Sequence, residues 1–155
     1  MTEVMTPVVM AIDTNVLVYA EGEGDAARCA SAQKLLARVQ PTAVVLPVQV
    51  LGELHRVLTG RFRRDGRAVR DDILSWSDAF RVVESSFAAL QAALDLHADH
   101  QLPIWDAMIL AVAAEHGCRL LLSEDYQTGF TWHGVTVVDP FAQSLHPLLR
   151  QALKR

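Results

Sequence analysis

A short apolar run near the start of the chain ends abruptly in polar residues, and this junction constrains the fold more than any other stretch. Val8 to Ile12 are apolar throughout, and Asp13, Thr14 and Asn15 follow at once. An unbroken apolar run of this length is typical of a strand buried on both faces, as in a parallel sheet. Open α/β sheets bind ligands at the carboxyl ends of such strands. Asp13 is therefore the first candidate for chemistry.

The rest of the chain alternates between short apolar runs and longer segments with helical spacing. Strands are predicted at 43–46, 120–122 and 135–138, with a short edge strand at 81–84. Such alternation predicts an α/β sandwich with a mainly parallel central sheet. The predicted helices are Ala26–Val39, Val48–Leu58, Arg67–Phe80, Phe87–Gln101 and Ile104–His116, with a weak helix in Phe141–Arg155 interrupted by Pro147.

Length and composition predict one folded domain spanning residues 1–155. The 155 residues are 51% hydrophobic and carry a formal net charge of -4, so a strongly basic nucleic-acid footprint is absent. Cys29 and Cys118 are far apart and indicate neither a disulfide framework nor a zinc site. No signal peptide and no bilayer-spanning apolar run is visible, so we expect a cytoplasmic protein without a membrane segment.

Acidic residues stand at the ends or starts of four separate predicted elements. Asp13 ends the first strand, and Asp125, with Glu124 beside it, follows a later one. Glu53 and Asp106 lie near the starts of helices that each follow a proline. A helix that follows a strand begins at the carboxyl end of that strand, which places Glu53 on the same rim as Asp13. For Asp106 the preceding element is helical, so its place on the rim is less tightly implied.

Converging carboxylates repel one another and raise one another's pKa, so such a cluster persists when a cation neutralises it. Carboxylate oxygens suit Mg²⁺ or Mn²⁺ better than zinc. Each acid also has a simpler interpretation: Asp13 as a loop cap, Glu53 and Asp106 as partners of a helix dipole, and the remaining two as turn residues. Their joint occurrence on four elements favours a metal site suited to phosphodiester cleavage.

The acidic segments resemble those of the PIN-domain ribonucleases, in particular the toxin half of bacterial VapBC-type toxin–antitoxin pairs. The resemblance runs from about Val8 to Val138, and it depends on the order, spacing and placement of four short motifs. The four motifs are Ile12–Leu17, Val50–Leu54, Trp105–Ala111 and Leu121–Asp125.

This resemblance implies a PIN-like three-layer α/β/α sandwich and a Mg²⁺- or Mn²⁺-dependent endoribonuclease that cuts single-stranded or structured RNA. It implies that Asp13, Glu53 and Asp106 are catalytic residues and core metal ligands, with Asp125 as the fourth acid. It also implies a homodimer, and a small cognate antitoxin protein that inserts residues into the acidic groove.

Four neighbouring polar residues are expected to support the acids. Ser123 and Asp125 fall on one side of an extended strand, which favours Asp125 over Glu124 as the fourth acid, although the choice between the two stays open. By the same family resemblance, Thr14 or Asn15 would orient the first acid through a hydrogen bond.

One basic segment lies between two predicted helices. Its arginines can bind RNA phosphates, contact an antitoxin, or lie in a solvated loop and helix start. The sequence leaves these three interpretations open. The five residues are Arg61, Arg63, Arg64, Arg67 and Arg70.

Two functional hypotheses follow. The first is a metal-dependent endoribonuclease that acts as the toxin of a toxin–antitoxin system, and the alternative is a catalytically inactive PIN-fold module that binds RNA or protein. The presence of all four acids favours the enzyme. Other enzyme classes have less support, because the chain has no P-loop, no Gly-x-Ser-x-Gly elbow and no second acid two residues after Asp13.

Overall fold

The computed structural model describes residues 7–126 and 128–153, and in this part of the chain it confirms the predicted α/β alternation. The strands join into one sheet with the order β3-β2-β1-β4-β6-β5, and only the β5–β6 pair is antiparallel. β1 therefore lies inside the sheet, between β2 and β4, and β3 is the predicted edge strand. The strands are β1 (Met10–Ile12), β2 (Val44–Pro47), β3 (Arg81–Val83), β4 (Leu120–Leu122), β5 (Thr131–Trp132) and β6 (Val135–Val138).

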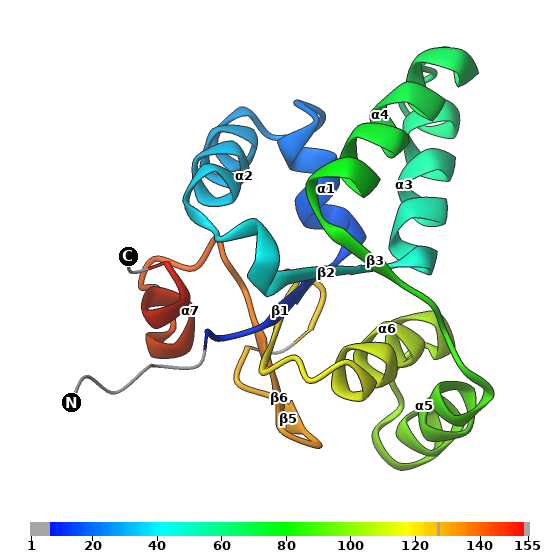
Figure 1. Cartoon of the computed structure of the whole chain (residues 1–155), viewed down its shortest axis with the longest axis vertical. Helices are drawn as coiled ribbons and strands as arrows, with labels where there is room; N and C mark the ends of the chain where they lie inside the picture. Colours follow the sequence, from blue (N-terminus) through cyan, green and yellow to red (C-terminus); the bar gives the residue numbers. More distant parts are fainter. Residues whose placement is uncertain (1–6, 127, 154–155) are drawn as a thin grey trace.

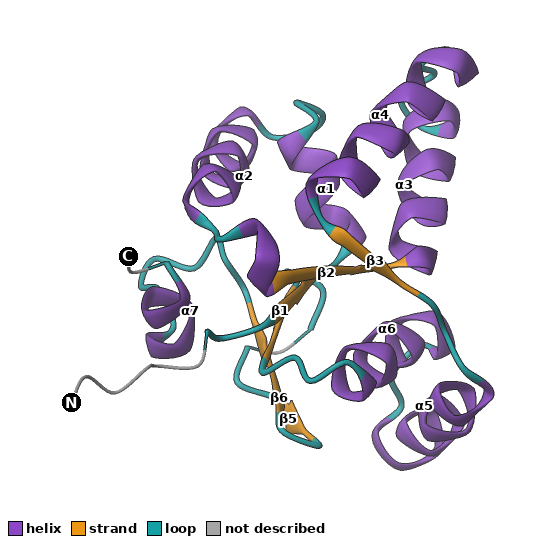
Figure 2. Cartoon of the chain, viewed as in Figure 1, coloured by secondary structure: helices purple, strands orange, loops and turns teal. Residues whose placement is uncertain are grey.

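Helices cover both faces of this sheet, which confirms the three-layer α/β/α sandwich. Figure 1 shows α1 to α4 on one side and α5 with α6 on the other, and Figure 2 shows the strands between these two groups. The helices are α1 (Thr14–Ala20), α2 (Ala26–Arg38), α3 (Val48–Gly60), α4 (Gly66–Ala79), α5 (Phe87–His100), α6 (Ile104–Glu115) and α7 (Pro147–Ala152). Among the residues described, no helix has the length and apolarity that crossing a bilayer requires.

The centre of the sheet is fully buried, as the apolar runs predict. Every side chain of β1 and β4 is buried, and Met10 pairs in parallel register with Val44 on one side and Leu120 on the other. Burying one such large apolar side chain contributes about 1.5–3 kcal/mol. The carboxyl end of β1 is therefore a rigid point, flanked by the ends of two equally buried strands.

Helix α6 fixes a second rigid point at this edge. Its residues Ala107 to Ala113 are all buried, which is expected of a helix that is apolar on every side. It packs against α5 and contacts β2, β4 and β6. The first turn of α6, which carries Asp106, is thereby held against the sheet.

Besides the 3-10 helix η1 (Pro41–Ala43), two short elements were not predicted from the sequence. The first is α1, where Val16 and Val18 are poor helix formers, but Asp13 caps the helix and both valines are buried. The second is β5, which returns to β6 through a two-residue turn at His133 and Gly134. Both turn residues have positive φ, which matches the tight hairpin turn that follows the strand twist.

The prediction for the tail was wrong in the described residues. Residues 141–146 are not helical, and Pro147 begins α7 instead of interrupting a helix. Proline suits the first helical position because the N–H that it lacks would have no partner there. The last two residues of the predicted helix, 154 and 155, lie outside the described residues.

Candidate functional site

Asp13 lies at the carboxyl end of β1 and is held by three hydrogen bonds. Its backbone N–H donates to the Leu122 carbonyl at 2.9 Å, so the chain leaves the sheet in a fixed direction. One carboxylate oxygen accepts from the Thr14 backbone N–H at 2.7 Å, and the other accepts from the Ser123 hydroxyl at 2.8 Å. Asp13 is 2% exposed. The carboxylate is thus oriented by residues from two adjacent strand ends.

Burial raises the pKa of Asp13 to about 7, although the hydrogen bonds from Ser123 and Thr14 act to lower it. The negative charges of Asp106 and Asp125 raise it further. A carboxylate with this surrounding binds a proton readily at neutral pH, and it binds another cation for the same electrostatic reason.

Asp106 lies in the first turn of α6 and belongs to the same cluster. Burial raises the pKa of Asp106, and the charges of Asp125 and Glu53 add to the effect. The nearby Tyr126 hydroxyl is buried and makes no hydrogen bond of standard geometry to the described residues. Burial and the charges of the three aspartates raise the pKa of Tyr126, so its hydroxyl stays protonated. The structure therefore brings Asp106 to the rim, where the sequence placed it only loosely.

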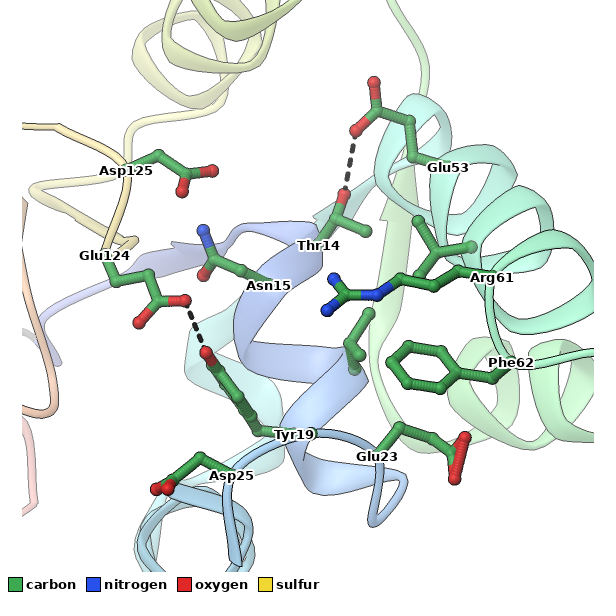
Figure 3. Close-up of a pocket in the computed structure, with 13 residues that line it drawn as sticks. Thr14, Asn15, Tyr19, Glu23, Asp25, Glu53, Arg61, Phe62, Glu124 and Asp125 are labelled. Atoms are coloured by element: carbon green, nitrogen blue, oxygen red, sulfur yellow. Dashed lines mark hydrogen bonds between the residues drawn. The ribbon is translucent and has the colours of Figure 1, made fainter. Parts of the chain in front are cut away.

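Glu53 reaches the rim from α3, because β2 pairs with β1 and α3 begins where β2 ends. Its carboxylate accepts from the Thr14 hydroxyl at 3.2 Å, as Figure 3 shows. Asn15 donates from its side-chain nitrogen to Ser123 at 3.3 Å. The side-chain oxygen of Asn15 is buried and has no hydrogen-bond partner among the described residues. It is an oxygen near the acids that accepts no hydrogen bond from the described residues.

Glu124 and Asp125 are adjacent in sequence but have different surroundings. Glu124 accepts from the Tyr19 hydroxyl at 2.7 Å and forms an ion pair with Arg28. Asp125 is exposed, its backbone N–H donates to Ser123 at 3.1 Å, and its charge acts on Asp13. The structure thus brings Asp125 together with the other acids, whereas Glu124 is paired with a cation of the chain itself.

A pocket of about 350 Å³ opens beside the acids (Figure 3). It continues from the rim along α1 toward the end of α3. Five of the thirteen lining residues are carboxylates, and Arg61 is the one cation among the thirteen. The lining comprises Thr14, Asn15, Val18, Tyr19, Glu23, Gly24, Asp25, Glu53, Val57, Arg61, Phe62, Glu124 and Asp125.

The five arginines of the basic segment do not share one environment. Arg61 lines the pocket, and Arg64 is half-buried in ion pairs with carboxylates of the chain. Arg70 pairs with its neighbour Asp71 on the surface. Arg63 and Arg67 are exposed and form no ion pair with the described residues. Only Arg61 is positioned to meet a ligand at the acidic rim.

The donor set suits a hard cation in its chemistry. Mg²⁺ takes oxygen ligands and is commonly bound through one or two carboxylates, with water in its remaining positions. Carboxylates with raised pKa and a buried amide oxygen without a partner provide such donors. Among the described residues, no three His, Cys, Asp or Glu side chains stand close enough to enclose an ion. The chain alone thus offers an open, partial set of ligands.

Two residues that contact Glu124 were not predicted from the sequence. Tyr19 lies four residues after Asn15, which puts both on one side of a helix, but this relation is visible only once α1 is recognised. Arg28 comes from α2 and meets Glu124 across a separation of 96 residues, for which the sequence carries no signal.

A parallel α/β sheet whose carboxyl edge gathers aspartates and a glutamate around one buried acid defines the class of this protein. The family model of the PIN domain matches residues 10–130, and the chain belongs to this family. The resemblance seen in the sequence motifs is thereby confirmed. No curated protein sequence matches the chain.

Solved structures share the fold at low sequence identity. VapC20 of Mycobacterium tuberculosis, a Sarcin-Ricin loop cleaving toxin, is similar with a TM-score of 0.63 and 24% identity, over 75% of this chain and 89% of the toxin. A toxin-antitoxin complex from Klebsiella pneumoniae has a TM-score of 0.65 and 20% identity over 85% and 98%. FitAcB from Neisseria gonorrhoeae has a TM-score of 0.64 and 18% identity over 86% and 99%.

Proposed function

We propose that this protein is an endoribonuclease that depends on Mg²⁺ or Mn²⁺ and acts as the toxin of a toxin–antitoxin pair. The observation that carries the proposal is the rim itself. Burial raises the pKa of Asp13 and of Asp106, and the negative charge of Asp125 raises both further. Among the described residues, no Lys, Arg or His forms an ion pair with these acids. Structural stability alone does not favour such a cluster, whereas binding of a divalent cation does. The fold shared with toxins supports the biological half of the proposal.

In this proposal the cation is held at the rim by Asp13, Glu53, Asp106 and Asp125, some of them through water, because no three of these described side chains stand close enough to enclose an ion. When bound, the cation supplies positive charge that polarises the scissile phosphate and offsets the charge developing during cleavage. The chain's own contribution is orientation. Ser123 and the backbone of residue 14 fix both oxygens of Asp13, and the Thr14 hydroxyl fixes Glu53.

An RNA substrate, a small antitoxin partner, a homodimer and a cytoplasmic location belong to the same proposal. They follow from the family expectation, and one of the similar structures, from Klebsiella pneumoniae, is a toxin-antitoxin complex. The antitoxin part has its own test. A small protein encoded beside this chain is expected to bind it and suppress its RNA cleavage.

Cleavage of a panel of RNAs with Mg²⁺ or Mn²⁺ tests the nuclease function. We expect cleavage by the wild type and by Asp99→Asn, which makes the same change on an exposed face of α5. We expect none by Asp13→Asn or Asp106→Asn. Equal cleavage by Asp13→Asn and the wild type would contradict the proposal. RNA binding without cleavage of any substrate would instead favour the inactive PIN-fold module.

A further inference from the structure

The pocket beside the acids has two chemically different ends (Figure 3). Glu53 and Asp125 belong to the acidic rim, while Tyr19 and Phe62 give the other end an aromatic character. The guanidinium group of Arg61 points into the space between them. A volume of about 350 Å³ is near the lower limit of pockets that enclose a small ligand. The pocket therefore suits one compact unit of a larger substrate.

Arg61 is placed for an external partner. It follows the last turn of α3, its side chain is exposed, and the described residues offer it no ion pair. Its guanidinium group lies over the Phe62 ring, 5.1 Å from the ring centroid. A cation held against an aromatic face keeps its direction without losing its charge. Phe62 is thus a positioning residue for Arg61.

The acids at this end of the pocket already have partners within the chain. Glu23 lies 3.7 Å from the Arg64 guanidinium group, and Asp25 accepts from the backbone N–H of residue 28 as the cap of α2. Glu124 is paired with Arg28 and Tyr19. Their charges are partly compensated, whereas the charge of Arg61 is not. An anionic group is therefore the ligand that would pair with Arg61, the one lining residue whose charge is positive.

We infer that this pocket is a nucleotide subsite, in which Arg61 binds a phosphate adjoining the scissile one and the attached base enters toward Tyr19 and Phe62. The inference rests on the proposed nuclease function for the identity of the scissile phosphate. One RNA strand offers both features at the required places, namely a phosphate beside each base and a flat base that packs against aromatic and guanidinium groups. Because the base must leave its stack to enter, the subsite selects unpaired RNA.

Binding of a short single-stranded RNA, followed by fluorescence anisotropy in Ca²⁺, tests the subsite without requiring cleavage. We expect Arg61→Gln to weaken binding about tenfold, which corresponds to losing one charge-assisted phosphate contact. The slope of log K against log salt should fall by about 0.7, as for one phosphate contact on a single strand. Arg61→Lys should retain the salt slope, because it retains the charge.

Arg67→Gln is the matched control, because it removes the same charge from an exposed residue outside the pocket. We expect it to change the affinity less than about twofold. Equal weakening by both variants, or no effect of Arg61→Gln, would overturn the inference. Poly-glutamate that competes as well as RNA at an equal concentration of negative charge would also overturn it. The pocket would then fit an acidic protein segment.

Cleavage adds a second, independent measurement. In this experiment a neutral methylphosphonate replaces the phosphate beside the mapped cleavage site. The replacement should lower kcat/KM about tenfold for the wild type, and it should not change kcat/KM for the Arg61→Gln variant. If the substitution and the methylphosphonate each lower kcat/KM and the two losses multiply when combined, Arg61 does not contact that phosphate. If no RNA is cleaved but binding still depends on Arg61, the proposed nuclease function fails while the nucleotide subsite stands.

Discussion

Two charge clusters at opposite ends of α1 differ in how their charges combine. At the acidic rim, Asp13, Asp106 and Asp125 bring negative charges together, and none of the three forms an ion pair with another described residue. In the second cluster, Arg64 stands among carboxylates and contacts the Glu21 side chain and backbone carbonyl, each at 2.7 Å. The first cluster has charges that add, and the second has charges that cancel.

The Arg64 cluster is built for stability. Burial opposes the charge of Arg64, but the hydrogen bond and the charge of Glu21, together with Glu23 and Asp72, raise the pKa of Arg64 above its ordinary value. Trp76 completes it by donating to Glu21 at 3.0 Å. These contacts tie the loop after α1 to α4. The charges of this cluster are compensated within the chain, whereas the acids of the rim have no ion-pair partner among the described residues.

Asp13→Asn is the strongest test of this difference, because its effects on activity and stability have opposite signs. We expect cleavage to fall more than about 100-fold, beyond the range for partners that only orient a ligand. The metal-free protein should become more stable by up to about 4 kcal/mol at pH 8, because a buried carboxylate with pKa about 7 no longer has to ionise. Chemical denaturation in EDTA measures this gain.

The stability gain of Asp13→Asn should depend on pH, and the pKa of Asp13 determines the direction of that dependence. The pKa of Asp13 is about 7 in the folded state against 3.8 ordinarily, so the folded state binds this proton more tightly than the unfolded state. The wild type therefore loses stability from this group as the pH rises from about 4 to 7. The advantage of Asp13→Asn should grow by about 2–3 kcal/mol between pH 5 and pH 8. A constant advantage would contradict the charge explanation.

Ser123→Ala tests whether the rim needs its orienting contacts. Ser123 is fully buried, donates to Asp13 and accepts from the backbone of Asp125, so its loss frees two acids at once. We expect cleavage to fall about 10–100-fold, with a raised apparent metal requirement. Ser123→Thr, which keeps the hydroxyl, should recover part of the activity. An unchanged metal requirement would show that Ser123 serves packing alone.

Sequence and structure agree most closely where the signal is local. The apolar runs predicted the inner strands, and the rule that helices start at strand ends predicted Glu53 at the rim, where it accepts a hydrogen bond from Thr14. The roles of the charged surface residues could not be predicted in this way. Arg64 pairs with Glu21 across 43 residues, and nothing in the run of arginines distinguishes it from Arg61. The difference arises from the packing of helices, which leaves one guanidinium group half-buried and the other exposed.

Arg64→Met tests the second cluster. Removing the cation leaves Glu21, Glu23 and Asp72 as like charges, and the Arg64 side chain is only 26% exposed. We expect the free energy of unfolding to fall by about 2 kcal/mol. Arg67→Met, at an exposed site, should stay within about 0.5 kcal/mol of the wild type. A loss of kcat/KM in the folded Arg64→Met protein would instead assign Arg64 to RNA binding.

The smallest effect separates two neighbouring acids. Glu124 belongs to the cancelling kind of cluster, because Tyr19 and Arg28 compensate it, while Asp125 acts on the rim. We expect Asp125→Asn to lower cleavage about tenfold. Glu124→Gln should change it less than about twofold, because glutamine still accepts from Tyr19 and the lost ion pair is partly exposed. A larger loss of cleavage in Glu124→Gln than in Asp125→Asn would make Glu124 the fourth acid. An ion pair within the chain would then no longer distinguish structural from functional carboxylates in this protein.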